Sequence, residues 1–226
     1  MAGPDTVPSS VRGGPCLFIG TTNPAKAHRL RRAIADWPFE TLGPEDLPFP
    51  VDLPAEVGNS HLEIAVDKAL AWSRATGHLT IASDGGLVIP ALGTRWNSLT
   101  TGRSAGPGAN GQQRIRGLVE LMDPHTGDSR RASWSESVAV VNAPATLASW
   151  RVEGPTGFLS RQPSPVSIDG FWAASLWYFP DFGKAYTELS DDELEAVGDP
   201  WTRLTSQIQE WLGSGGWEQV SGATTS

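Results

Sequence analysis

Near its beginning the chain passes from a buried-strand pattern to a helix pattern over a very short distance. The apolar run 16–19 ends at Gly20, which suits a short buried strand. Asn23 is a favoured helix cap and Pro24 a favoured first helical residue, and apolar residues then recur at helical spacing: Leu30, Ala33, Ile34 and Trp37. A strand that leads straight into a helix is a building unit of α/β proteins, so we expect that class of fold.

Later segments continue the alternation of strands and helices. Apolar periodicity predicts helices from 60 to about 74, around 115–122 and from about 199 onward, and paired strands over 132–142 and 147–153. Together these elements predict an α/β fold in which helices flank a mixed central sheet. We expect a single domain over residues 15–213, with flexible ends over 1–14 and 214–226, where Gly, Ser, Pro and Thr are frequent.

Two segments in the middle of the chain are expected to interrupt the regular elements. Strand signals at 79–82 and 87–89 are separated by the turn-forming residues Asp84, Gly85 and Gly86. Residues 93–111 are rich in glycine and predict a long loop, and loops of that length in compact domains are usually functional or disordered.

Charge and composition exclude several classes of function. The net charge of −8 repels polyanions, so we expect neither nucleic acid nor a membrane surface as a partner. No apolar run is long enough to span a membrane, and no signal peptide is visible. The single cysteine, Cys16, cannot form an internal disulfide, and we expect a cytoplasmic location.

The turn from the first strand into the first helix is a candidate phosphate site. It contains Thr21, Thr22, Asn23 and, one turn further on, Lys26. Amides at a helix start favour anions, and the lysine adds a full positive charge. The alternative is an ordinary capped helix with a solvated lysine.

Two acidic residues are candidate ligands for a metal ion. Glu63 follows Ser60 by three positions and so also matches a capping box, while Asp84 stands beside glycines and equally suits a plain turn. If the fold brings the two carboxylates together, they offer the oxygen ligands that Mg²⁺ takes alongside water and phosphate. The backbone at Gly85 would allow a ligand to approach closely.

Aromatic residues gather late in the chain and offer a surface on which a nucleobase could stack. Core packing is the default interpretation of such a stretch. Its members are Phe171, Trp172, Trp177, Tyr178, Phe179 and Phe182.

The order of these motifs resembles that of the inosine/xanthosine triphosphate pyrophosphatases, which convert deaminated purine nucleoside triphosphates to the monophosphate and pyrophosphate. Residues 21–26 are similar to the family's Thr-Gly-Asn-x-x-Lys turn. Residues 58–69 resemble Gly-x-Thr-Phe-x-Glu-Asn-Ala-x-x-Lys-Ala, with Ile64 in place of Asn. Residues 82–87 resemble Ala-Asp-Asp-Ser-Gly-Leu, with the second Asp kept as Asp84, and Arg103 stands in a segment like Ala-Arg-Tyr-Ala-Gly.

The resemblance implies two lobes around a nucleotide cleft, a homodimer, and dependence on Mg²⁺, which Mn²⁺ could replace. It implies Asp84, Lys26 and Glu63 as catalytic residues, with Glu63 and Asp84 holding the metal. The implied substrate contacts are Thr21, Thr22, Asn23, Lys26, Gly85, Arg103, Phe171, Trp172 and Ala174.

The departures from the family are concentrated where it contacts the base. The family's Gly-Phe-Gly-Tyr-Asp-Pro is replaced by residues 170–175, which lack the Tyr and the Asp. Its later Ser-His-Arg is replaced by residues 198–200, so Asp199 and Arg203 become candidates for new base contacts. We therefore expect a nucleoside triphosphate pyrophosphatase with altered base specificity. The alternatives are a nucleotide-binding protein without turnover and a hydrolase of another phosphorylated metabolite.

Overall fold

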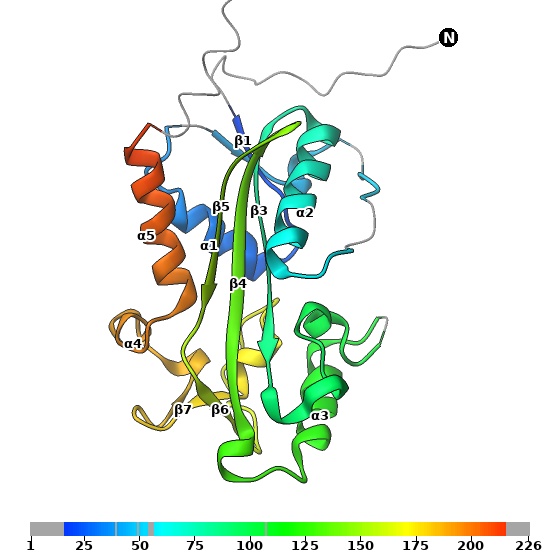
Figure 1. Ribbon diagram of the computed structural model, residues 1–226, viewed down its shortest axis with the longest axis vertical. Helices are drawn as coiled ribbons and strands as arrows, with labels where there is room; N and C mark the ends of the chain where they lie inside the picture. The colour runs from blue at the N-terminus through cyan, green and yellow to red at the C-terminus, as the bar shows by residue number, and fades with distance from the viewer. Residues whose placement is uncertain (1–15, 39, 49, 54–56, 107, 216–226) are drawn as a thin grey trace, which may run out of the picture. The chain divides into compact units, whose positions relative to one another are not determined.

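The computed structural model describes residues 16–38, 40–48, 50–53, 57–106 and 108–215 (Figure 1). The prediction of flexible ends over 1–14 and 214–226 falls almost wholly outside these residues. The chain forms two compact units. The first comprises Met1–Asp84, Ser137–Trp150 and Thr205–Ser226, and the second comprises Gly85–Glu136 and Arg151–Leu204.

Parallel strands form the centre of the first unit. The strand β1 (Cys16–Ile19) is wholly buried and pairs in parallel with β2 (Glu40–Leu42) on one side and β3 (Leu79–Val88) on the other. The order continues from β3 to β4 (Arg131–Asn142), which pairs with β5 (Ala145–Glu153). By their residue ranges, β3, β4 and β5 each contribute to both units.

The described α-helices of the first unit are α1 (Pro24–Ala33), α2 (His61–Thr76) and the later part of α5 (Pro200–Gly213). The small side chains of α2 allow it to pack closely beside β3 and β4 (Figure 1), in a core cluster of Ala65, Ala69, Ala82, Ala139 and Val141. On α5, Trp211 contacts Trp37 and Trp150 at ring-centroid distances of 6.0 and 5.7 Å.

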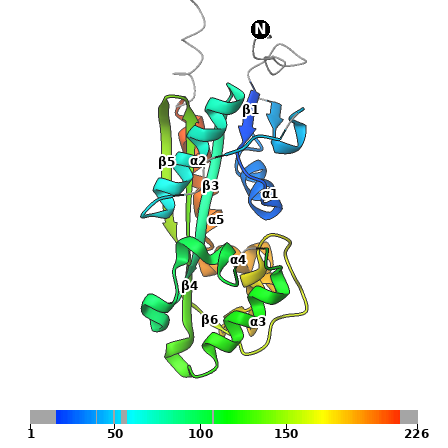
Figure 2. The same ribbon diagram turned by 90° about the vertical axis from the view of Figure 1, so that its right-hand side faces the viewer.

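Antiparallel pairing dominates the second unit. Short strands add to β4 in the order β6 (Gly157–Leu159), β7 (Trp177–Phe179) and β8 (Lys184–Ala185), and each neighbouring pair is antiparallel. The helix α3 (Gly111–Met122) lies beside the short helix η5 (Trp172–Ser175), as Figure 2 shows, and α4 (Asp191–Val197) precedes α5. Parallel and antiparallel pairs with flanking helices confirm the predicted mixed α/β fold.

Two predictions for the middle of the chain are wrong. The strand β3 runs without interruption through Asp84, Gly85 and Gly86, where a turn was expected. These glycines continue the strand because neither takes a positive φ. The segment 93–111 is not simply a loop: it holds the end of the short helix η2 (Pro90–Arg95), all of η3 (Ser98–Arg103) and the first residue of α3.

The remaining described elements are the short helices η1 (Pro44–Asp46), η4 (Gly127–Arg130) and η6 (Tyr186–Glu188). Within the described part of the chain, every helix is too short or too polar to cross a membrane.

Candidate active site

The parallel pairing of β1 and β3 brings two motifs to the same edge of the sheet. Ile19, the last residue of β1, lies opposite Ile81 of β3, and the Gly20 amide donates to the Ile81 carbonyl at 2.8 Å. Because parallel strands run in the same direction, the helix start after β1 and the residues of β3 beyond Ile81 extend toward one end. Lys26 and Asp84 meet there.

The start of α1 is built as its sequence predicts. Asn23 is the cap, and its Oδ1 accepts from the Lys26 amide at 3.1 Å, while Pro24 occupies the first turn. Thr21 is buried, and its Oγ1 accepts from the Asn23 amide at 3.1 Å, whereas Thr22 is exposed. The turn thus has the structure of a capped helix start, the form in which backbone amides attract anions.

Asp84 is the centre of a cluster of basic side chains. Its Oδ1 lies 3.8 Å from Lys26 Nζ and 3.9 Å from Lys68 Nζ, and its Oδ2 lies 2.6 Å from His61 Nδ1. The two lysine distances are ion-pair distances rather than hydrogen bonds. The side chain of Asp84 is 10% exposed, and those of Lys26 and Lys68 are 15% and 16% exposed.

The surroundings of Asp84 keep its carboxyl group ionised. Burial acts to raise the pKa of Asp84, but the hydrogen bond from His61 and the positive charges of Lys26 and Lys68 outweigh it, so the pKa is lowered. The site therefore presents a carboxylate and two ammonium groups in one place. Lysine ammonium groups bind phosphate, and a carboxylate can hold a hard cation or orient water.

The helix α2 supplies two members of this cluster, and sequence reasoning assigned a role to neither. His61 and Lys68 are seven residues apart, which is about two helical turns, so both lie on the face of α2 that also carries the buried Ile64 and Ala65. His61 stands where the pyrophosphatase motif has Phe. For His61 that substitution was the available signal, and for Lys68 the signal was its match to the Lys of the motif.

Glu63 is held at the start of α2. Its amide donates to Ser60 Oγ at 3.1 Å, as a capping box requires, but its Oε2 accepts from the Asn59 amide at 2.7 Å instead of from Ser60. The side chain is exposed. Among the residues described, no group of three or more His, Cys, Asp or Glu could hold a metal ion, so Glu63, His61 and Asp84 do not form a ready-made metal centre.

The carboxylates of Asp84 and Glu63 still fit one kind of metal binding. Mg²⁺ is commonly held by one or two carboxylates together with water and substrate phosphates, not by a cage of protein ligands. The ionised Asp84 beside two phosphate-binding lysines suits an ion that arrives with a triphosphate. Glu63, an exposed residue two positions after His61 on α2, is the candidate second carboxylate.

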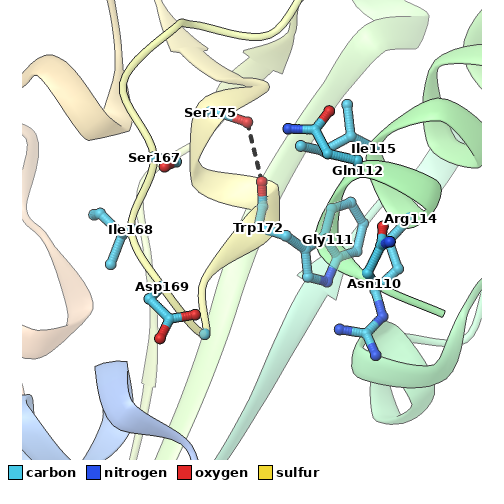
Figure 3. A pocket seen from close by; sticks show the side chains of 11 residues that line it. Asn110, Gly111, Gln112, Arg114, Ile115, Ser167, Ile168, Asp169, Trp172 and Ser175 are labelled. Atoms are coloured by element: carbon cyan, nitrogen blue, oxygen red, sulfur yellow. Dashed lines mark hydrogen bonds between the residues drawn. The ribbon is translucent and has the colours of Figure 1, made fainter. Parts of the chain in front are cut away.

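The second unit contains a pocket of about 380 Å³ between α3 and the segment that leads into η5 (Figure 3). Trp172 points from η5 toward α3, where it lies beside Gly111 and Arg114. Asp169 lines the pocket from the segment that leads into η5. The Nε of Arg114 is buried and has no hydrogen-bond partner among the described residues. A flat aromatic face with a nearby donor and carboxylate suits a planar polar ring.

The other predicted substrate contacts of the second unit do not line this pocket. Phe171 is buried and packs against Trp134 and Tyr186, and Ala174 is fully buried, so both belong to the core and not to the pocket. Gly85 lies within β3, and Arg103 is exposed at the end of η3.

The two candidates for new base contacts also have structural roles. Asp199 is buried, accepts from Tyr186 Oη at 2.6 Å, and accepts from the amides of Trp201 and Thr202 at the start of α5. Arg203 donates to the Glu153 carbonyl at 3.0 Å. Sequence reasoning named both as candidates because they stand near the position of the missing Ser-His-Arg motif.

The fold and the first-unit cluster define a mixed α/β protein with a lysine–carboxylate site at a capped helix start, a class suited to phosphorylated ligands. Comparison with known proteins makes this specific. The chain belongs to the Ham1 family, whose model matches residues 17–197.

Similar relatives agree with this membership, and a solved structure agrees with the fold. A dITP/XTP pyrophosphatase of Anaeromyxobacter dehalogenans is 34% identical, covering 85% of this chain and 96% of that protein. Another of Geobacillus kaustophilus is 28% identical, covering 86% and 93%. A HAM1 protein from Coxiella burnetii has a similar fold, with a TM-score of 0.69 at 24% identity over 87% of this chain and 100% of the other.

Proposed function

We propose that this protein hydrolyses nucleoside triphosphates to the monophosphate and pyrophosphate with Mg²⁺. The proposal rests on one observation, the Asp84 carboxylate beside Lys26 and Lys68 at 3.8 and 3.9 Å. The relatives named dITP/XTP pyrophosphatases support it, since they match this chain over most of their length.

In this mechanism the residues of the first unit bind and orient the triphosphate. The amides at the start of α1, with Asn23 and Lys26, bind phosphate oxygens, and Lys68 adds a second positive charge. Thr22 in the same turn and the exposed Arg103 remain proposed contacts. Water attacks the α-phosphorus, the bond to the α–β bridging oxygen breaks, and pyrophosphate leaves with the electron pair. Asp84 orients the water and accepts its proton.

Asp84 and Glu63 are the residues that would hold Mg²⁺. When bound, the ion supplies Lewis-acid stabilisation of the charge on the phosphate oxygens. Mn²⁺ takes similar oxygen ligands and would be expected to replace it.

The pocket of the second unit is proposed to accept a planar polar ring such as a nucleobase. Stacking on Trp172 is tolerant of base identity, and Arg114 and Asp169 offer one donor and one acceptor group. The family's Tyr and Asp are replaced by Ala173 and Ala174, which are buried. We therefore propose a base preference that differs from strict selection of 6-oxo purines.

A panel of inosine, xanthosine, adenosine, guanosine and pyrimidine triphosphates tests both the proposed reaction and the proposed base preference. Equal amounts of pyrophosphate and monophosphate are expected. Release of orthophosphate, or binding without turnover, would contradict the proposed reaction. For specificity, a kcat/KM preference of about 10⁴ or more for inosine over adenosine triphosphate would show that the base preference is not altered.

Variants in the pocket separate base binding from the reaction itself. Arg114→Met should alter the ranking of bases, and Arg116→Met, at the exposed position two residues further along α3, serves as the matched control. An unchanged ranking in Arg114→Met would place the base elsewhere.

We also propose a homodimer that acts in the cytoplasm. The support is the family resemblance and, for the compartment, the single cysteine. A solution mass near twice the 24.1 kDa of one chain is expected.

A further inference from the structure

The two oxygens of Asp84 have different partners. Oδ2 lies 2.6 Å from His61 Nδ1, and Oδ1 faces the ammonium groups of Lys26 and Lys68. His61 is the first residue of α2 and is 5% exposed, so its ring is fixed by the core of the first unit. A hydrogen bond from a fixed ring to one carboxylate oxygen sets the orientation of the other oxygen.

We infer that His61 is a positioning residue for Asp84. It donates Nδ1–H to Oδ2 and so keeps Oδ1 directed toward the two lysines, where the triphosphate is proposed to bind. This inference rests on the proposed function of the same site. Partners that orient a reacting or metal-binding group act through geometry, and removing such a partner typically costs about 10- to 100-fold in activity or metal affinity.

The alternative role for His61 is simple packing, and the two roles can be separated. The related motif has Phe at this position, an aromatic side chain of similar size that fills the same space without an N–H group. If His61 only packs, His61→Phe should be silent. If it positions Asp84, Phe leaves Oδ2 without this donor, and the carboxylate is free to rotate.

Three variants form the kinetic test. His61→Phe should lower kcat about 10- to 100-fold and change KM for the triphosphate much less, because the lysines remain. His61→Asn, whose amide N–H can take the place of Nδ1–H, should recover most of the loss. His28→Phe, at an exposed position on α1, is the matched control and should keep wild-type kcat. An unchanged kcat in His61→Phe would overturn the inference, as would equally slow Phe and Asn variants with wild-type Tm.

A spectroscopic readout tests the contact independently of turnover. Side-chain ¹⁵N NMR can assign the His61 signals, because they are absent from the spectra of His61→Phe and His61→Asn. In the wild-type protein these signals should show a protonated Nδ1. An unprotonated Nδ1 would overturn the inference. If the wild-type protein releases no pyrophosphate from any triphosphate, the proposed function fails, while this measurement still decides whether His61 holds Asp84.

Discussion

Asp84 keeps its negative charge in a mostly buried position because its partners are basic. Burial acts to raise the pKa, and the His61 hydrogen bond with the Lys26 and Lys68 charges lowers it below the usual range. An ionised carboxylate at this point can orient water and share a cation with phosphate. Replacing the carboxylate by an amide keeps the shape and removes the charge.

Asp84→Asn should therefore lower kcat by about 100-fold or more, as expected for loss of a group that accepts a proton in the reaction. Pyrophosphate release under saturating Mg²⁺ measures the loss, and Tm checks the fold. Full activity in this variant, or wild-type activity that persists in excess chelator, would contradict the proposed mechanism.

Lys26 and Lys68 lie at nearly equal distances from Asp84, and both should contribute to phosphate affinity. Lys26→Ala and Lys68→Ala should each weaken triphosphate binding about 10-fold or more while leaving nucleoside binding nearly unchanged, because only the triphosphate meets the ammonium groups. Calorimetric titration with the two ligands measures this, with exposed Arg32→Ala of α1 as control. Equal losses for both ligands would argue against a phosphate site.

The sequence identified part of this cluster and missed the rest for a physical reason. Asn23 and Lys26 stand at a strand-to-helix turn whose local pattern indicates a phosphate site. Asp84 was predicted as a metal ligand, although the turn expected around it is part of the strand β3. His61 and Lys68 reach Asp84 only because α2 packs beside β3, and that approach depends on small residues such as Ala65 and Ala82, which carry no chemical signal of their own. Pairings that depend on tertiary contact do not show in a single sequence.

At the scale of elements, periodicity identified the long ones. The helices α2, α3 and α5 and the strand pair β4–β5 were all predicted, because many residues repeat their pattern. Strands such as β2 and β8 have three and two residues, too few to show alternation. The strand β3 was divided wrongly because Asp84, Gly85 and Gly86 were taken for a turn.

Gly85 serves close packing in β3. A Cβ at this position would fall on the carboxylate of Glu136, which is buried and accepts from Trp134 Nε1 at 2.8 Å, and would lie 2.7 Å from the Ser135 carbonyl oxygen. Gly85→Ala should lower the free energy of unfolding by about 1 to 3 kcal/mol through overpacking. Denaturant titration measures it, with Gly102→Ala as control, since a Cβ there meets nothing within 4 Å. The cost should shrink in a Glu136→Ala background, and an unchanged cost would contradict this explanation.

At the scale of the whole molecule, neither compact unit is one continuous stretch of chain. The first is assembled from three segments and the second from two, and β3, β4, β5 and α5 contribute residues to both. When one part of such a strand is hydrogen-bonded in its sheet, the backbone of the part in the other unit is also restrained. The loss of either unit should therefore disturb elements of the other.

The two units should accordingly unfold together. Hydrogen exchange measured by mass spectrometry through a denaturant titration should give the same midpoint for peptides around Trp72 in the first unit and Trp177 in the second. Midpoints that differ beyond experimental error would show that the units are independently stable. Circular dichroism over the same titration should follow a single transition.

The late position of α5 has a consequence for biosynthesis. The first unit opens with β1 at Cys16, yet it also needs the residues of α5 from Thr205 onward, including Ile208, which is fully buried. The ribosome must make nearly the whole chain before this unit can close. Until α5 is made, the apolar strand β1 lacks a helix of its unit, and a partly folded chain with exposed apolar strands is prone to aggregation.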